Sequence, residues 1–477
     1  MSPEENEDIE AQMGYLSLGP DKRHLDEVLG SPLLTVPVVQ STPPPQFGLF
    51  GVNRSGDAPP RAARLFYNVT CPSSVFICGS QGSGKSNTLA CLLENCLIPS
   101  RLGKLPAPLT GVVFHYDSFV SDSGGLPCEA AFLASSEDVS VRVLCAPTNI
   151  RTVQKMYGRI PEVKVEPLIL SDRDLNTRRM LDLMAVGEGG MPLYLHVVTR
   201  ILRDMRIEQQ STGSGFSYAT FKKRLDLADL TAAQRGPLSQ RLDTLESFMA
   251  KGVKGDAAAG KPTVDWQAKS SQLTIVDLSC PCVTAEMACS LFNICLSLFL
   301  EQESAIGRVV AVDEAHKYMK ESSESQALTG ALLETIRLQR HLGVRVIVST
   351  QEPTVSTKLL DLCSVTVVHR FTSPDWLRTL RSHLAGVSSM SVTASGREET
   401  EDVGSVAMGG KDPVLELFAM IVGLRTGEAL VFAPSAVIGL GEGRAGGPVE
   451  VQRLAHRSLR VQVRSRLTRD GGQTIMA

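Results

Sequence analysis

The stretch Gly79-Ser80-Gln81-Gly82-Ser83-Gly84-Lys85-Ser86 decides the fold of this chain. It matches the pattern G-x-x-x-x-G-K-[ST], in which glycines let backbone N–H groups close around phosphate oxygens. The apolar run 74–78 before it predicts a buried strand, and leucines at helical spacing in 87–97 predict a helix after it. Strand, glycine loop and helix are the context that this pattern needs. We therefore expect the chain to bind a nucleoside triphosphate.

The individual positions of this P-loop predict distinct roles. Lys85 is expected to reach the β- and γ-phosphates, and the hydroxyl of Ser86 to hold Mg²⁺. The dipole of the helix that begins there adds positive potential at the phosphates. The expected cofactors are thus ATP and Mg²⁺. The predicted nucleotide contacts are Gly79, Ser80, Gln81, Gly82, Ser83, Gly84, Lys85, Ser86 and Asn87.

A second stretch supplies acids. In Val309-Val310-Ala311-Val312-Asp313-Glu314, four apolar residues predict a buried strand that delivers two carboxylates at its C-terminal end, where ligands of α/β proteins bind. We expect Asp313 to hold Mg²⁺ through water and Glu314 to polarise the attacking water as a general base. For each of two further residues, the sequence leaves two alternative roles open. Asp277 is a turn or cap residue, or it contacts a ligand of the metal, and His316 is a structural histidine or a relay of the phosphate state.

Other nucleotide-using classes fit the sequence less well. A small-molecule kinase does not need the second acid, and the guanine-reading motif Asn-Lys-x-Asp of GTPases does not occur. Residues 313–316 also spell the DEAH box of one helicase superfamily. Lys85 and Asp313 are more than two hundred positions apart, which is further than the compact lobe of those helicases allows. The sequence therefore favours ATP hydrolysis.

A third stretch runs from Arg337 to Gln351. Its apolar strand ends in Thr350-Gln351, and this predicts that Gln351 lies beside the γ-phosphate, where it senses hydrolysis. Arg337 and Arg340 end the preceding helix. Two roles stay open for these arginines: they complement the helix dipole, or one of them is an arginine finger that reaches into the ATP of a neighbouring subunit.

The ordered set of motifs resembles HerA/FtsK-type ATPases. Besides the three stretches above, it includes 370–375 (Arg-Phe-Thr-Ser-Pro-Asp) and 424–430 (Leu-Arg-Thr-Gly-Glu-Ala-Leu), and it spans roughly 65 to 435. The resemblance implies a RecA-like motor, commonly a hexameric ring that pumps duplex DNA through a central channel. It further implies that Arg340, with Arg337 second, is the finger acting in trans, and that Gln351 is the sensor.

The rest of the chain predicts an α/β fold around the motifs. Apolar runs alternating with helices predict a RecA-like P-loop NTPase, with a mainly parallel sheet covered by helices on both faces. We expect a disordered acidic and Pro-rich leader over 1–60, an ATPase domain over 61–440 with a helical insertion at about 191–250, and a basic C-terminal strand and tail over 441–477. The predicted strands are 74–78, 111–115, 139–145, 273–277, 308–313, 344–350, 365–371, 430–433 and 459–467.

Composition limits the partners. The net charge of −3 gives no global positive field, so contact with DNA must come from local patches: the loop with Lys251, Lys254 and Lys261, or the arginines between 453 and 469. The most apolar stretch, 283–300, carries Glu286 and Asn293 and is too polar for a membrane span. The eleven cysteines form no CxxC pair, and we expect a cytoplasmic or nuclear protein. The alternative function is a nucleotide-dependent switch or scaffold, or a protein-remodelling ATPase.

Overall fold

The computed structural model describes residues 20–56, 58–119, 124–184, 193–249, 264–303, 305–383, 413–441 and 450–471. The chain divides into two compact units. Unit 1 comprises residues 1–107 and 360–466, and unit 2 comprises residues 108–359 and 467–477. The sequence predicts one ATPase domain over 61–440, so this division was not foreseen. The P-loop belongs to unit 1, and the acids at 313–314 belong to unit 2.

Unit 1 is built on a mixed sheet with the strand order β15-β14-β1-β3-β2-β16-β13-β12-β4. Strands β4 and β12 pair in parallel, whereas β12, β13, β16, β2, β3 and β1 pair successively antiparallel. The strands are β1 (Leu33–Thr35), β2 (Phe47–Asn53), β3 (Arg64–Asn68), β4 (Ser74–Cys78), β5 (Gly103–Lys104), β12 (Val365–His369), β13 (Glu428–Phe432), β14 (Val437–Gly441), β15 (Glu450–Arg453) and β16 (Ser458–Val463).

The helices of unit 1 flank these strands. Helix α4 follows the P-loop, and nearly all of its residues are buried. The helices are α2 (Pro20–Leu29), α3 (Val36–Ser41), α4 (Lys85–Leu97), α14 (Pro374–His383) and α16 (Pro413–Val422), and α13 (Thr357–Leu362) contains the boundary with unit 2.

The leader predicted to be disordered over 1–60 is structured within its described part. Residues 20–53 form α2, β1, α3 and β2, and β1 pairs with β3 and with β14. Val28, Leu34, Val38 and Val437 form a buried cluster that joins this segment to the strand β14. The prediction was wrong because the apolar residues there are spread over short elements, which bury them only by pairing with strands distant in the sequence.

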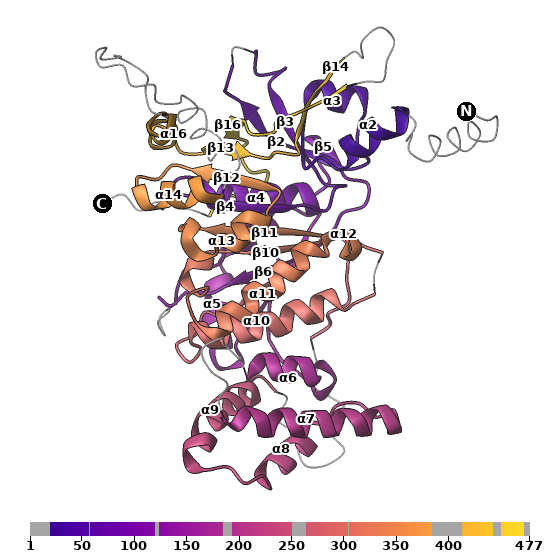
Figure 1. Cartoon of the computed structure of the whole chain (residues 1–477), viewed down its shortest axis with the longest axis vertical. Coiled ribbons are helices and arrows are strands. Elements are labelled where there is room, and N and C mark those ends of the chain that lie inside the picture. Colours follow the sequence, from indigo (N-terminus) through magenta and orange to yellow (C-terminus); the bar gives the residue numbers. More distant parts are fainter. Residues whose placement is uncertain are drawn as a thin grey trace, which may run out of the picture. The chain divides into compact units, whose positions relative to one another are not determined.

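Unit 2 contains a sheet of six strands in the order β11-β10-β6-β9-β7-β8. Figure 1 labels β11, β10 and β6 of this sheet. Every neighbouring pair is parallel. The strands are β6 (Thr110–His115), β7 (Ser140–Cys145), β8 (Val163–Pro167), β9 (Gln272–Asp277), β10 (Arg308–Val312) and β11 (Val344–Thr350). All residues of β6, β10 and β11 are buried, and since successive side chains point to opposite faces, both faces are covered. The predicted α/β fold with a mainly parallel sheet is thus confirmed in unit 2.

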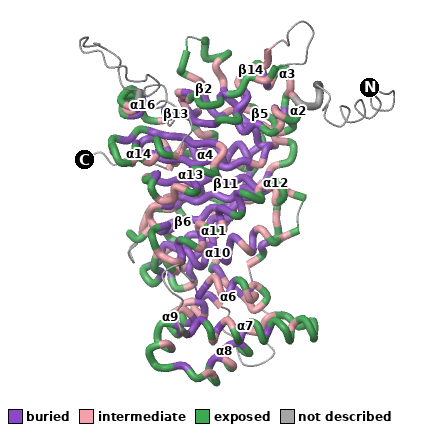
Figure 2. Tube along the Cα trace, viewed as in Figure 1, coloured by how far each residue is buried: buried purple, intermediate pink, exposed green. Residues whose placement is uncertain are grey.

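The helices of unit 2 differ in how far they are buried. Helix α10 begins at the N-cap Thr284, whose side chain accepts a hydrogen bond from Met287 N, and its remaining length is almost entirely buried. Figure 2 shows more exposed residues along α7 and α8. The helices are α5 (Ile150–Tyr157), α6 (Thr177–Leu183), α7 (Leu193–Thr212), α8 (Tyr218–Asp226), α9 (Ala232–Phe248), α10 (Ala285–Leu300), α11 (Ser323–Arg337) and α12 (Gln339–Leu342), with short 3₁₀ turns at η1 (Glu129–Ser135), η2 (Pro147–Asn149), η3 (Asp172–Asp174), η5 (Ala315–Lys317) and η6 (Pro353–Val355).

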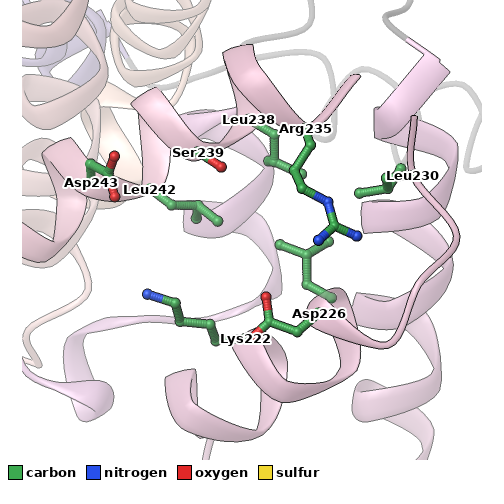
Figure 3. A pocket seen from close by; sticks show the side chains of 9 residues that line it. Lys222, Asp226, Leu230, Arg235, Leu238, Ser239, Leu242 and Asp243 are labelled. Carbon is green, nitrogen blue, oxygen red and sulfur yellow. The ribbon is translucent and has the colours of Figure 1, made fainter. Parts of the chain in front are cut away.

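The helical insertion expected at about 191–250 corresponds to α7, α8 and α9. A small hollow between α8 and α9 is lined by leucines and by the charged residues Lys222, Asp226, Arg235 and Asp243 (Figure 3). None of these residues belongs to a motif of the sequence. The basic loop predicted to contact DNA, with Lys251, Lys254 and Lys261, lies outside the described residues.

Candidate nucleotide site

The P-loop connects β4 to α4 in unit 1. Its glycines have backbone conformations that other residues rarely adopt, with φ of 70° at Gly82 and 112° at Gly84. At Gly79 a side chain is also excluded by space, because a Cβ there would lie 2.6 Å from the Cβ of His369. Lys85 is 4% exposed, and its Nζ donates to the carbonyl of Ser80 at 3.0 Å. The predicted phosphate ligand is therefore folded back over its own loop.

Two segments from the C-terminal half of the chain hold the P-loop. The backbone N–H and the hydroxyl of Ser80 both donate to the carbonyl of Arg370, at 2.9 and 2.8 Å. The N–H of Gly427 donates to the carbonyl of Ser83 at 3.0 Å. Arg370 and Gly427 belong to the two motifs, 370–375 and 424–430, that complete the resemblance to HerA/FtsK-type ATPases. Their backbone groups, and not their side chains, make these contacts.

His369 is the residue of this site that the sequence analysis missed. Its Nδ1 lies 2.9 Å from the carbonyl of Glu428, so Nδ1 carries the hydrogen, and Nε2 accepts from the Thr88 hydroxyl at 2.9 Å. Burial, followed by the charge of Lys85, lowers the pKa of His369 to about 4. The signal was a histidine at the end of the β-branched run 365–368.

Helix α4 is attached to the C-terminal segment by a buried ion pair. Arg464 donates to Glu94 at 2.7 Å, and the two side chains are 6% and 0% exposed. The guanidinium also donates to the carbonyls of Leu49 and Cys91. The side chain of Asn87, predicted as a nucleotide contact, donates to the carbonyl of Arg464 at 3.0 Å. This arginine therefore holds the P-loop helix in place.

Three of the six arginines between 453 and 469 form ion pairs within unit 1. Arg460 donates to Glu428 at 2.7 Å, and Arg453 contacts Glu27 at 3.3 Å. With Arg464 bound to Glu94, three of the candidate DNA contacts carry structural ion pairs. These three arginines are therefore partly neutralised, because acidic residues from other strands and helices lie opposite them.

In unit 2, Glu314 follows β10 and has a left-handed backbone with φ of 49°, a strained conformation that is concentrated at functional sites. His316 Nε2 contacts Glu314 Oε2 at 3.3 Å, and the amide of Gln351 donates to the same oxygen at 3.2 Å. The N–H of Gln351 points at His316 Nδ1 at 3.3 Å, so Nδ1 accepts and Nε2 carries the hydrogen. The predicted base, the predicted sensor and His316 thus form one triangle.

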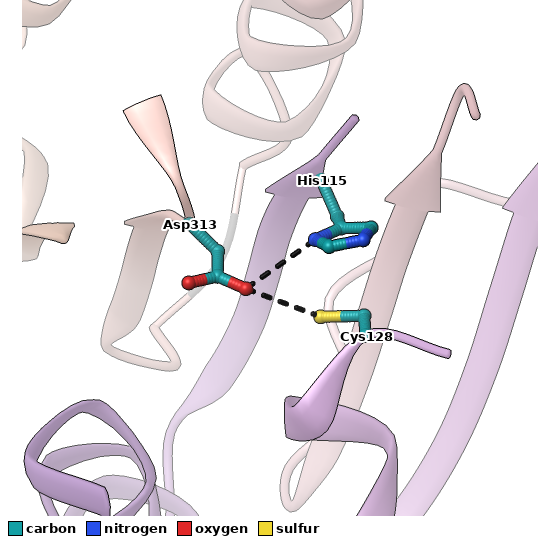
Figure 4. A group of neighbouring side chains, drawn as sticks. All are labelled: His115, Cys128 and Asp313. Atoms are coloured by element: carbon teal, nitrogen blue, oxygen red, sulfur yellow. Dashed lines mark hydrogen bonds and ion pairs between the residues drawn. The ribbon is translucent and has the colours of Figure 1, made fainter. Parts of the chain in front are cut away.

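Asp313 lies beside His115 and Cys128 (Figure 4). Asp313 Oδ2 is 3.3 Å from His115 Nδ1 and 3.8 Å from Cys128 Sγ. Burial alone lowers the pKa of His115, but Cys128 and the hydrogen bond with Asp313 outweigh it and raise that pKa well above 6.5. Burial raises the pKa of the Cys128 thiol. The three side chains thus form one buried, hydrogen-bonded cluster.

Asp277 lies at the end of β9, next to the end of β6. It accepts from the hydroxyl of Tyr157 at 2.6 Å and from the N–H of Ser279 at 2.9 Å. Tyr157 in turn accepts from the N–H of Cys128 at 2.9 Å. Of the two readings left open for Asp277, the contacts show the turn residue, and through Tyr157 it also positions the loop that carries Cys128.

The two candidate finger arginines are solvent-exposed. Arg337 is the last residue of α11, and Arg340 lies in the four-residue helix α12. Within the described residues, neither arginine forms an ion pair or a side-chain hydrogen bond. Both guanidinium groups are thus available for a partner that is not part of this chain.

No family model and no curated protein matches this sequence. Among solved structures, VirB4 of Thermoanaerobacter pseudethanolicus is 12% identical over 88% of this chain and 96% of that chain, with a TM-score of 0.47. The bacterial conjugative coupling protein TrwB is 14% identical over 84% and 88%, with a TM-score of 0.40. The DNA-packaging ATPase B204 from Sulfolobus Turreted Icosahedral Virus is 10% identical over 80% and 97%, with a TM-score of 0.30.

These structural neighbours are P-loop ATPases of the FtsK/HerA type, the class that the motifs of this chain resemble. Because the identities and the TM-scores are low, the chemistry proposed below rests on the residues of this chain. In the described part of the chain, no helix combines the length and the apolar character that a membrane crossing requires.

Proposed function

We propose that this chain is a Mg²⁺-dependent ATPase. The observation that carries the proposal is the triangle of Glu314, His316 and Gln351. A carboxylate that is carried on a strained backbone and oriented by an imidazole N–H and an amide is suited to polarise a water molecule and to register the loss of a phosphate. The P-loop of unit 1 supplies the phosphate-binding backbone, and Lys85 would exchange the carbonyl of Ser80 for the phosphates.

The residues proposed to hold Mg²⁺ fit a hard cation. Asp313 is 5% exposed, and its Oδ1 is buried without a hydrogen-bond partner within the described part of the chain. A buried carboxylate oxygen in that state is destabilised unless a cation or an ordered water reaches it. The hydroxyl of Ser86 is the second proposed contact. Bound Mg²⁺ would neutralise charge on the phosphates, while Glu314 acts on the water.

Hydrolysis is tested by two substitutions with matched controls. Lys85→Ala should abolish phosphate release and weaken ATP binding, whereas Lys104→Ala removes an exposed lysine of unit 1 and should change neither. Glu314→Gln should abolish turnover but retain ATP binding, since Lys85 and Asp313 are kept. Glu321→Gln, an exposed acid of unit 2, is its control. Turnover by Glu314→Gln equal to that of the natural chain would remove Glu314 from the mechanism.

We further propose that the active form is a ring in which Arg340 completes the site of the neighbouring subunit, with Arg337 as the second candidate. The exposure of both side chains, and the absence of partners for them within the described residues, support this role. Activity should then rise steeply with protein concentration, and sedimentation should show the assembly. A fully active monomer would rule out this part of the proposal.

Duplex DNA is the proposed substrate of the motor, by the resemblance of the motifs. ATPase activity should be measured against duplex DNA, single strands and RNA over a salt series, because phosphate neutralisation makes affinity fall linearly with log salt. Stimulation by duplex DNA is the expected result. If no nucleic acid binds at low salt or stimulates turnover, the chain is a protein-remodelling ATPase or a nucleotide-dependent scaffold. Phosphate release without DNA distinguishes these two, because the remodelling ATPase hydrolyses ATP and the scaffold barely does.

A further inference from the structure

We propose that His115, Cys128 and Asp313 form a binding site for a divalent transition-metal ion of the Zn²⁺ class. One nitrogen, one sulfur and one carboxylate oxygen are the ligands that Zn²⁺ takes in proteins. All three residues are buried, and their candidate ligand atoms lie within 4.8 Å of one another. Mg²⁺ avoids such a set, because it prefers oxygen ligands and retains its water.

The two distances to Asp313 fit one tetrahedral ion. With bonds of about 2.1 Å to nitrogen and oxygen and about 2.3 Å to sulfur, tetrahedral angles place N and O about 3.4 Å apart and S and O about 3.6 Å apart. The corresponding distances to Asp313 Oδ2 are 3.3 Å from His115 Nδ1 and 3.8 Å from Cys128 Sγ. The ligands are therefore nearly in place before an ion arrives.

The backbone on all sides of the cluster is fixed by hydrogen bonds. The N–H of Asp313 donates to Phe114 of the neighbouring strand at 3.0 Å, and Tyr318 donates to the carbonyl of Asp313 at 3.1 Å. The N–H of Cys128 donates to Tyr157, which is bound to Asp277. Preorganisation of this kind lowers the cost of binding, because few side chains have to be ordered when the ion arrives.

The charges of the filled site cancel. A neutral imidazole, a thiolate and a carboxylate then balance the two positive charges of the ion. Burial of a balanced set costs far less than burial of an isolated charge.

Such a site would regulate the motor, and this second step rests on the proposed function. Asp313 is the carboxylate proposed to hold Mg²⁺. An ion bound to its Oδ2 withdraws negative charge from the same carboxylate, so the nucleotide-bound Mg²⁺ is held less well. We therefore expect Zn²⁺ to reduce hydrolysis through Cys128.

Binding is tested with Co²⁺ on the full-length chain after treatment with a chelator. The background is Cys282→Ser, because Cys282 is an exposed cysteine that would bind metal loosely. We expect one Co²⁺ per chain, a near-ultraviolet thiolate-to-cobalt charge-transfer band and its loss when Zn²⁺ is added. Cys128→Ser or His115→Asn should abolish the band or weaken binding by about 100-fold. Cys145→Ser, which removes another buried thiol of unit 2, should retain it.

Absence of the band, or an unchanged band in Cys128→Ser, would overturn the site. Thermal unfolding of each variant shows whether the chain still folds, and His115→Asn provides a second route if Cys128→Ser does not. An adventitious surface site would give binding that is equal in all variants, and this also overturns the proposal.

Regulation is tested by the ratio of ATPase rates with and without one equivalent of Zn²⁺, measured within each variant. We expect a fall of about tenfold or more with Cys128 present, a ratio near one for Cys128→Ser, and the larger fall again for Cys145→Ser. Equal inhibition of all variants would show that Zn²⁺ acts at the nucleotide. It would refute the link between Zn²⁺ binding at Cys128 and ATP hydrolysis. A Co²⁺ site in a chain without any ATPase activity would leave the metal site standing and refute the proposed function.

Discussion

The His369 side chain should make unit 1 unstable in mild acid. In the folded chain its ring is buried between Thr88 and the carbonyl of Glu428, and its pKa falls from 6.5 to about 4. As the pH falls below 6.5, the unfolded chain takes up a proton at this position, while the folded chain does not until about pH 4. Stability is therefore fully present above pH 6.5 and is lost as the pH falls towards 4.

The size of the effect follows from the two pKa values. A pKa difference of about 2.5 corresponds to about 3 kcal/mol once the pH is below both values. Between pH 7 and pH 5 the expected loss from this residue is about 2 kcal/mol. Protonation also converts Nε2 into a donor, which ends the bond from Thr88 and places a positive charge near Lys85. ATP binding by the folded chain should therefore weaken only near pH 4, where this ring takes up its proton.

The assay compares the natural chain with His369→Asn, which keeps a donor for the Glu428 carbonyl and removes the titrating ring. Urea unfolding of both proteins at pH 7 and pH 5 gives the free energy of unfolding that each protein loses between these pH values. Subtracting the two losses isolates His369, because the effects of other groups such as His115 cancel. His456→Asn, an exposed histidine of unit 1, is the matched control. NMR with labelled histidine measures the pKa directly. A His369 ring that titrates near 6.5, or an equal acid loss in His369→Asn, would refute this reasoning.

Three further predictions concern other contacts. Arg464→Ala should lower the free energy of unfolding by about 3–5 kcal/mol, because it leaves the Glu94 carboxylate buried and unpaired; urea unfolding checks this, and the double variant Arg464→Met/Glu94→Gln should recover part of the loss. Tyr157→Phe should cost about 1–3 kcal/mol, since Asp277 and the N–H of Cys128 both lose a partner, and a thermal melt unchanged from that of the natural chain would contradict it. Arg340→Ala should reduce turnover by about 10³-fold or more, and mixing it with Glu314→Gln should restore some activity, whereas no rescue would argue against composite sites.

The parallel core of unit 2 could be predicted from the sequence because its strands are continuous apolar runs. The expected strands 308–313 and 344–350 correspond to β10 (Arg308–Val312) and β11 (Val344–Thr350). In unit 1, β4 (Ser74–Cys78) was predicted with the same bounds. The left-handed conformation of Gly84 likewise follows from a pattern that requires glycine at that position.

The N-terminal strands could not be predicted in the same way. Strand β1 has three residues, and β2 contains two glycines and alternates between buried and half-buried positions. Such segments carry little local signal, since their pairing partners, including β14 and β16, come from the far end of the chain. The prolines near residue 44 also suggested disorder, because no nearby segment offered a pairing partner that would indicate strands.

The roles of polar residues outside the motifs depended on contacts that spacing does not encode. The sequence presents Glu94 and Arg464 as two ordinary charges more than three hundred positions apart. Only the pairing of β16 with β2 and β13 brings Arg464 over α4. Cys128 and His115 were likewise not singled out, because nothing in the sequence places the loop before η1 beside the end of β6.

Two of the motifs that carry the resemblance, 370–375 and 424–430, support the backbone of the P-loop. A Cβ at Gly84 would lie 2.9 Å from the backbone nitrogen of Gly427, and Gly427 itself has φ of 80°. The loop 424–430 therefore needs glycine at 427 in order to donate to Ser83 from so close. The side chains of Arg370 and Arg425 are exposed and take no part in these backbone contacts. The P-loop of this chain is thus held in shape by β12 and β13, so loss of that support would impair nucleotide binding even with every residue of the P-loop intact.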